Sequence, residues 1–429
     1  MLTLLAPILA QLVTLNVGDR TAVRYLSVGD THWEGSTAPI VGLNFGWKRG
    51  AIGLAYSPSF TMRPLEKRPR DVLLFQFATV TASYAWRKTT LSLIEGLGYG
   101  QFTLQVQALA DPGANPAISQ APGSPTSTGG TNQPNTPGGT TPGGTTGNMM
   151  GTSKDPNPRA TNQLRYDGQV IKYGTSSTTV ALGHAVSRTV AVGANASYTV
   201  GSGLGDSKDE YPLITGTRVG AFASNTLVVS RRDDFTSSIA AQYSVSSLGN
   251  RAWAAFATEG WAHKIDARTS TRLSGGLAGT RFSQSDGLIG YSIYPTFSGG
   301  IAYVGPLQGG RLSLGATVGA APYLDTLRAT VDPRLGAGLS AGWSRKRFFA
   351  GLGAGAAISL SNDDRQGAVN SVGASIGAGY QLADSVLLDG GASTGWQTFE
   401  GTTIIPKSWT GFVGITFGTS VPLNGGAQR

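Results

Sequence analysis

The sequence predicts an all-β fold, a transmembrane antiparallel up-and-down β-barrel of about 18 strands, with 16 strands as the rival count. First, apolar residues alternate with Gly, Ser or Thr from residue 331 to 417, and a period of two residues is typical of β-strands. Second, only 13% of residues are charged, whereas a soluble sheet turns a charged face to water. Third, the chain lacks an apolar run of 18 residues, which excludes membrane-spanning helices and leaves a closed barrel as the way to cross lipid.

Residues 1–16 begin with an apolar run that is too short to span a membrane, and Ala10 is a small residue suited to signal peptidase. The run lacks the Lys or Arg that usually precedes such a segment. Three interpretations stay open: a signal peptide, a start codon placed too late, and a structured N-terminal segment.

Residues 17–104 form the first part of the predicted barrel. Alternating runs predict strands at 20–28, 39–47, 51–58, 72–86 and 90–104. Residues 105–163 differ sharply, because Pro and Gly recur in a background of Thr, Ser and Asn. Such a composition cannot bury a core, so we expect a disordered extracellular loop there, acting as a spacer, a surface tether or a partial plug.

Residues 164–417 supply the remainder of the barrel, and residues 418–429 form a C-terminal tail. The expected strands are 164–186, 190–200, 213–230, 235–246, 251–263, 270–282, 289–304, 311–321, 331–343, 348–360, 369–382, 386–398 and 408–417. The alternation is clearest in 331–343, where Leu335 and Leu339 alternate with Gly336 and Gly338. Apolar residues are expected to face lipid, and the small ones a water-filled lumen.

Connections alternate between short and long, as in outer-membrane barrels with tight periplasmic turns and longer outer loops. The longer ones are expected at 29–38, 59–71, 201–212, 322–330, 361–368 and 399–407. Basic residues crowd the short turns, and Arg231, Arg232, Arg345, Lys346 and Arg347 are the candidates for a basic periplasmic mouth. Such a mouth would concentrate anions, or its side chains would contact phospholipid. Trp next to basic residues, as at Trp47, suits the headgroup level.

Lumen-facing charges are candidates for setting ion preference in a pore. Arg334 and Asp389 fall on the small-residue face, and Arg24, Glu95, Arg218 and Glu259 are further candidate pore-lining residues. These charges could equally pair across the wall as structure.

Catalytic chemistry is not expected. The chain has no cysteine, so it has neither a disulfide framework nor a thiolate metal site. Its three histidines, His32, His184 and His263, do not show a metal-ligand spacing. We therefore expect no catalytic residue, no cofactor, no metal and no nucleic-acid partner.

On these patterns, residues 18–104 and 164–417 resemble a bacterial outer-membrane β-barrel of the porin-like kind. The resemblance implies an outer membrane of a Gram-negative-type bacterium, contact with its lipid, and a barrel-assembly machinery that reads a terminal aromatic residue. Phe417 would supply that aromatic, although a tail to Arg429 follows it. Three functions fit: a channel for small solutes, an export pore for an anionic polysaccharide, or a non-conducting surface scaffold or adhesin. The oligomeric state stays open.

Overall fold

The computed structural model describes residues 13–28, 30–62, 72–103, 170–206, 216–246, 249–285, 287–325, 330–360, 369–399 and 402–422. Residues 1–12 of the possible signal peptide, the segment 105–163 and residues 423–429 of the C-terminal tail lie outside the described residues, whereas residues 13–16 belong to a strand. None of the described segments is a helix long and apolar enough to cross a membrane.

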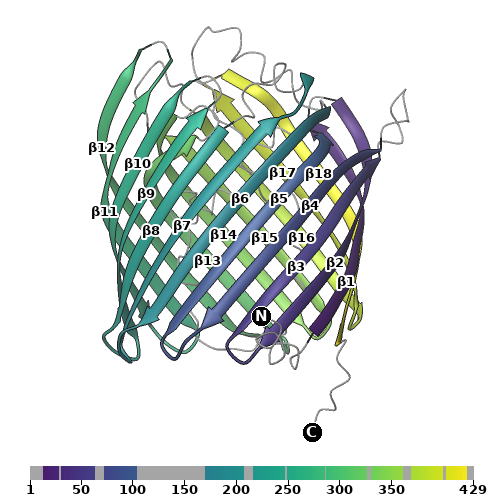
Figure 1. Cartoon of the computed structure of the whole chain (residues 1–429), viewed down its shortest axis with the longest axis horizontal. Helices are drawn as coiled ribbons and strands as arrows, with labels where there is room; N and C mark the ends of the chain where they lie inside the picture. Colours follow the sequence, from purple (N-terminus) through teal and green to yellow (C-terminus); the bar gives the residue numbers. More distant parts are fainter. Residues whose placement is uncertain are drawn as a thin grey trace, which may run out of the picture.

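Eighteen antiparallel strands form a closed barrel (Figure 1). Each strand pairs with the next along the chain, and β1 pairs with β18 over Thr14–Ser27 and Trp409–Pro422, which leaves no open edge. The strands are β1 (Val13–Val28), β2 (Asp30–Trp47), β3 (Gly50–Met62), β4 (Leu73–Ala85), β5 (Thr89–Thr103), β6 (Val170–Ala185), β7 (Val190–Gly203), β8 (Gly216–Val228), β9 (Asp233–Ser246), β10 (Arg251–Lys264), β11 (Thr269–Ser283), β12 (Ile289–Leu307), β13 (Gly310–Asp325), β14 (Thr330–Arg345), β15 (Phe348–Ser359), β16 (Val369–Ala383), β17 (Val386–Phe399) and β18 (Thr402–Pro422). The predicted fold class and strand count are confirmed.

The two faces of the wall follow the alternation of the sequence. Large apolar side chains on the outer face are widely exposed, as for Leu339 on β14 at 63% and Ile293 on β12 at 77%. Arg334, on the opposite face of β14, is only 9% exposed. Because an apolar outer face would be costly in water, this arrangement is that of a wall facing lipid.

Strand ends depart from the expected limits. The predicted loop 29–38 is wrong: β2 begins at Asp30, which pairs with Val28. Most of 322–330 and 399–407 is also paired strand, in β13, β14 and β18. These strand ends lack an apolar face because a spanning strand needs only about 9–11 residues in lipid, and the remainder rises beyond it. The barrel begins at Val13 and ends at Pro422, a few residues beyond the expected limits of 17 and 417.

At one rim, here called the short-turn rim, every connection is a turn of two to four residues. At the opposite, long-loop end the connections vary from the single residue between β1 and β2 to residues 104–169 between β5 and β6. At the short-turn rim, β12 and β13 are joined by Gln308 and Gly309, with φ values of 49° and 73°. Two consecutive residues of positive φ form the type I′ hairpin turn, whose twist matches that of the strands, and glycine suits its second position. Both β1 and β18 have their terminal ends at this rim, as an even strand count requires.

Candidate functional site

The lumen is lined by small residues on which aromatic rings lie. The Phe349 ring covers Gly379, where an added Cβ would come within 2.2 Å of it, and the Phe412 ring covers Gly391. A ring that lies flat against a neighbouring glycine occupies less of the lumen than one that points inward. The inner face therefore combines Gly, Ser and Thr with rings held against the wall.

An ion pair sits on this inner face at the seam that closes the barrel. Arg20 Nη2 of β1 donates to Asp389 Oδ2 of β17 at 3.0 Å, across β18. The Arg20 guanidinium also lies 5.7 Å from the centre of the Phe412 ring, within reach of a cation–π contact. Asp389 is one of the sequence-predicted lumen residues. Arg20, its partner, was missed because the first expected strand began at that residue.

Three further predicted residues lie on the inner face. Arg24 stands opposite Glu34 in the β1–β2 register. Arg218 of β8 donates to Gln242 Oε1 at 3.0 Å. Arg334 is buried near the long-loop end of β14. These side chains come from separate parts of the wall, so the structure does not gather the predicted residues into one cluster.

Glu95 and Glu259 are corrections, because both carboxylates lie on the outer face. Glu95 shares its face of β5 with the exposed Leu93 and Leu97. It accepts hydrogen bonds from the hydroxyl groups of Ser176, at 3.0 Å, and Thr178.

Glu259 lies between two outward-facing residues of the same strand, Trp253 and Trp261. Its Oε2 accepts from Ser237 Oγ at 2.7 Å. Neither acid contributes to the lumen. Each is instead bonded to hydroxyl groups that point to the same outer face.

Lumen charge is predominantly basic among the side chains that the structure describes. Basic residues on the inner face are Arg20, Arg24, Arg218, Lys264, Arg272, Arg311 and Arg334, whereas the acidic ones are Glu34, Asp234 and Asp389. Fixed positive charge along a narrow aqueous path raises the local concentration of anions.

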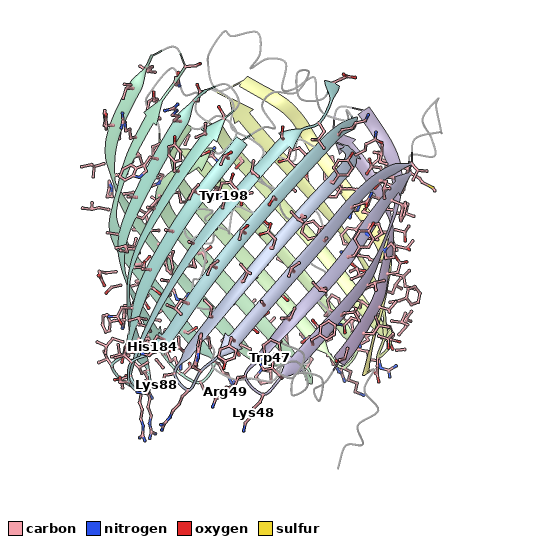
Figure 2. All side chains as sticks on the ribbon, viewed as in Figure 1. Trp47, Lys48, Arg49, Lys88, His184 and Tyr198 are labelled. Carbon is pink, nitrogen blue, oxygen red and sulfur yellow. The ribbon has the colours of Figure 1, made fainter. Side chains whose placement is uncertain are left out.

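The short-turn rim carries the basic residues predicted for the mouth. Arg231 and Arg232 lie in the β8–β9 turn, and Arg345, Lys346 and Arg347 span the β14–β15 turn. Figure 2 shows Lys48, Arg49 and Lys88 at the same rim.

One acidic turn residue at this rim is held by backbone groups. Asp266 Oδ1 accepts from the backbone N–H groups of Arg268 and Thr269 at 2.6 and 2.7 Å, which lowers the pKa of its carboxyl group. These hydrogen bonds stabilise the β10–β11 turn that carries Arg268.

Two belts of aromatic residues flank the apolar band of the outer face. Trp47, Trp86, Trp261 and Trp343 lie near the short-turn rim, and Trp33, Trp253 and Tyr291 lie near the other end. The Trp343 indole N–H donates to the Leu307 carbonyl at 3.1 Å. Such belts mark the two headgroup levels of a bilayer.

Within the described ranges, no group of three or more His, Asp or Glu residues lies close enough together to hold a metal ion.

No protein-family model and no curated protein sequence matches the chain. Solved structures do match. The FrpB iron transporter of Neisseria meningitidis, F5-1 variant, aligns with a TM-score of 0.53 at 10% identity, over 91% of this chain and 63% of the transporter. The F3-3 variant gives 0.52 at 11%, over 93% and 64%. The outer membrane protein OpdK of Pseudomonas aeruginosa gives 0.47 at 8%, over 95% and 99%.

The fold is that of a bacterial outer-membrane β-barrel of the porin-like kind. At these identities the likeness shows the fold alone. The chain spans less than two thirds of the length of the FrpB transporter. The function of this barrel is therefore inferred from its own residues.

Proposed function

We propose that the protein is a channel in the outer membrane of a Gram-negative bacterium, through which small solutes diffuse without catalysis. The observation that carries the proposal is the closed wall of eighteen strands whose inner face is mostly Gly, Ser and Thr. Barrels of 16–18 strands are wide enough to leave an aqueous path. Small polar side chains keep that path open to water.

The proposed channel prefers anions. The inner face carries more arginine than carboxylate, and the rim of short turns is basic. The field of each fixed charge extends over about one Debye length, roughly 10 Å at 0.1 M salt, so these charges act on ions that pass within that distance of the wall.

A polymer-export pore is the second candidate, and the basic rim favours it because an acidic polysaccharide would gather there. A scaffold barrel that conducts nothing is the third. Measurable conductance would support a channel or an export pore and exclude a non-conducting scaffold. If an acidic polysaccharide added at the short-turn side blocks that conductance, the export pore is favoured over the small-solute channel.

The test is a planar bilayer measurement on the purified full-length protein. We expect ohmic conductance, and a reversal potential under a KCl gradient that indicates mild anion preference. A bilayer that stays silent with the intact chain and with a variant lacking 105–163 would remove the channel proposal.

A matched pair of variants tests whether lumen charge sets the preference. Asp389→Asn removes a carboxylate from the inner face and leaves Arg20 without its ionic partner, so anion preference should increase. Asp19→Asn is the control, because Asp19 is on the opposite face of β1, bonded to Thr21 and Thr37 hydroxyls at 2.9 Å each. Equal shifts in both variants would contradict a lumen origin of the selectivity.

A further inference from the structure

A groove crosses the outer wall of the barrel from β6 to β11. It has a volume of about 570 Å³, within the range of ligand-binding pockets. Its floor is made of small outward-facing residues, Ala194, Ala223, Ala257 and Gly275. Leu182 borders the floor at β6, and Ile239 of β9 rises from it between Ala223 and Ala257. The wall is therefore hollowed on a face where other strands carry Leu, Val or Ile.

Two parallel rows of residues build this groove. One row is apolar and follows the strand register through Leu182, Ala194, Ala223, Ile239 and Ala257. The other row is largely polar and is shifted by two residues toward the short-turn rim. It runs through His184, Val192, Asn225, Ser237 and Glu259. The groove thus has a polar side that faces the rim and an apolar side that faces the middle of the membrane.

The depth of the polar row follows from its neighbours. Trp261 and His263 stand on the same face of β10 as Glu259, two and four residues nearer the turn. Trp belongs at the headgroup level of a bilayer. The polar row runs obliquely through the membrane: His184 is two residues from the β6–β7 turn, at the rim (Figure 2), whereas Glu259 is six residues from the β10–β11 turn, inside the level of Trp261. On each strand the apolar row lies two residues deeper, toward the acyl chains.

Basic turns lie directly below the groove. Arg188 belongs to the turn that joins β6 to β7, and Arg231 and Arg232 belong to the turn that joins β8 to β9. These turns connect the strands that form the groove floor. A phosphate at the rim would meet these three guanidinium groups.

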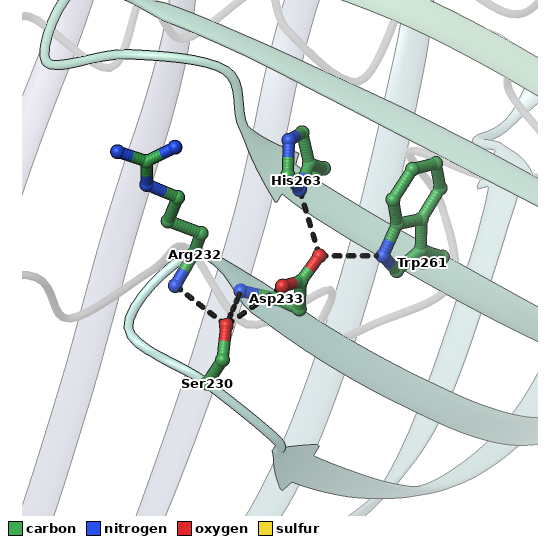
Figure 3. A network of polar contacts seen from close by, with 5 residues as sticks. All are labelled: Ser230, Arg232, Asp233, Trp261 and His263. Carbon is green, nitrogen blue, oxygen red and sulfur yellow. Dashed lines mark hydrogen bonds and ion pairs between the residues drawn. The ribbon is translucent and has the colours of Figure 1, made fainter.

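The β8–β9 turn is held in place by a polar network (Figure 3). Ser230 Oγ accepts from the backbone N–H groups of Arg232 and Asp233 at 3.0 Å and donates to Asp233 Oδ2 at 2.7 Å. Asp233 Oδ1 in turn accepts from Trp261 Nε1 at 3.1 Å and from His263 Nδ1 at 2.7 Å. The network connects the turn to β10 and so stabilises the backbone of the turn that carries Arg231 and Arg232.

We propose that this groove is a binding site for one anionic glycerophospholipid of the leaflet at the short-turn rim. Its phosphate contacts the basic turns of β6–β9, its ester region contacts Asn225 and Ser237, and one acyl chain lies on the alanine floor. Glu259 already accepts from Ser237 and lies at the end of the row remote from Arg188, away from the phosphate. The site is on the outer wall and does not depend on conduction through the lumen.

The experiment uses the full-length protein reconstituted in vesicles of phosphatidylethanolamine and phosphatidylglycerol, extracted in mild detergent and weighed by native mass spectrometry. We expect one retained phosphatidylglycerol per barrel. Ala223→Phe fills the floor and should abolish retention. Replacing Arg188, Arg231 and Arg232 with Ala should lower it by about 100-fold, since each basic residue near an anionic membrane surface contributes about 1 kcal/mol to binding.

Matched controls lie on the far side of the barrel. Ala378→Phe adds the same ring to the outward face of β16, and replacing Arg345, Lys346 and Arg347 with Ala removes the same charge from the β14–β15 turn. Both should retain the lipid, and a heat-dependent gel shift should show that each variant is folded. Equal retention in Ala223→Phe and the wild type, or equal loss in both triple variants, would overturn the proposal. So would a wild-type oligomer that Ala223→Phe dissociates, because the groove would then be a subunit contact.

Discussion

Glycines of the inner face make room for aromatic rings as well as for water. Gly379 and Gly391 each accept a phenylalanine ring from a neighbouring strand, where any side chain would collide with it. Glycine usually weakens a strand, but a ring packed across it restores the buried apolar area.

Gly379→Ala should therefore destabilise the barrel. The new methyl group would meet the Phe349 ring at 2.2 Å and force it away from the wall. Because Phe349 is exposed to the lumen and its ring can turn, the cost is that of moving the ring off its preferred rotamer, about 0.5–1.5 kcal/mol. Gly351→Ala is the control, because its new Cβ would meet only the Ala341 carbonyl oxygen, at 3.5 Å. Urea unfolding in detergent micelles measures both, and an equal loss in the two variants would contradict the role assigned to the ring.

The face on which a charge lies was easiest to predict where alternation is clean. Arg334 directly precedes the strict alternation from Leu335 to Trp343 and is on the inner face. Asp389 is on the inner face too, although the alternation around it is less regular. Around Glu259 the sequence reads Trp-Ala-Ala-Phe-Ala-Thr-Glu, with apolar residues on both faces. A shift of one residue in such a run reverses every side chain, so the sequence alone does not fix which face Glu259 occupies.

Strands extend beyond the lipid at the long-loop end, and their sequence changes there. Residues that rise above the membrane no longer need an apolar outer face, so the alternation fades while the backbone pairing continues. The segment from Asp30 to Pro39 is an example: it is fully paired with β1, yet Glu34, Gly35, Ser36 and Thr37 give no strand signal. Loop lengths read from hydropathy are thus overestimated at this end.

The connection between β5 and β6 tests which way the barrel faces. It leaves and rejoins the wall at the end opposite the short turns. If that end is extracellular, protease added to intact cells should cut within 105–163 and leave the barrel in the membrane. Cleavage only after lysis would reverse the orientation. Deletion of 105–163 should leave conductance unchanged if the segment is a spacer, and higher conductance would identify it as a plug.

At the scale of the whole molecule, closure is what makes the wall stable in lipid. Every strand has two neighbours, so no row of backbone groups faces the bilayer unpaired. The fold class and the strand count were predictable because this requirement, together with the lipid face, leaves a period-two signal in the membrane-spanning part of most strands. The groove from β6 to β11 was not predictable, since it arises from the register of six strands that no local pattern reveals.

Closure predicts a heat-dependent change of migration on detergent gels. The unheated barrel should remain compact and migrate differently from the boiled chain, with a β-rich circular dichroism spectrum. Ile415→Pro should abolish the compact band. Ile415 lies in the middle of β18, paired with Thr21 of β1 and Leu388 of β17, and proline removes a ladder hydrogen bond at the closing seam. Ile415→Ala keeps the backbone N–H and should retain the band. A compact unheated band for Ile415→Pro would show that the seam tolerates an interrupted ladder, and a wild-type chain that stays monomeric in water without detergent would contradict the membrane barrel itself.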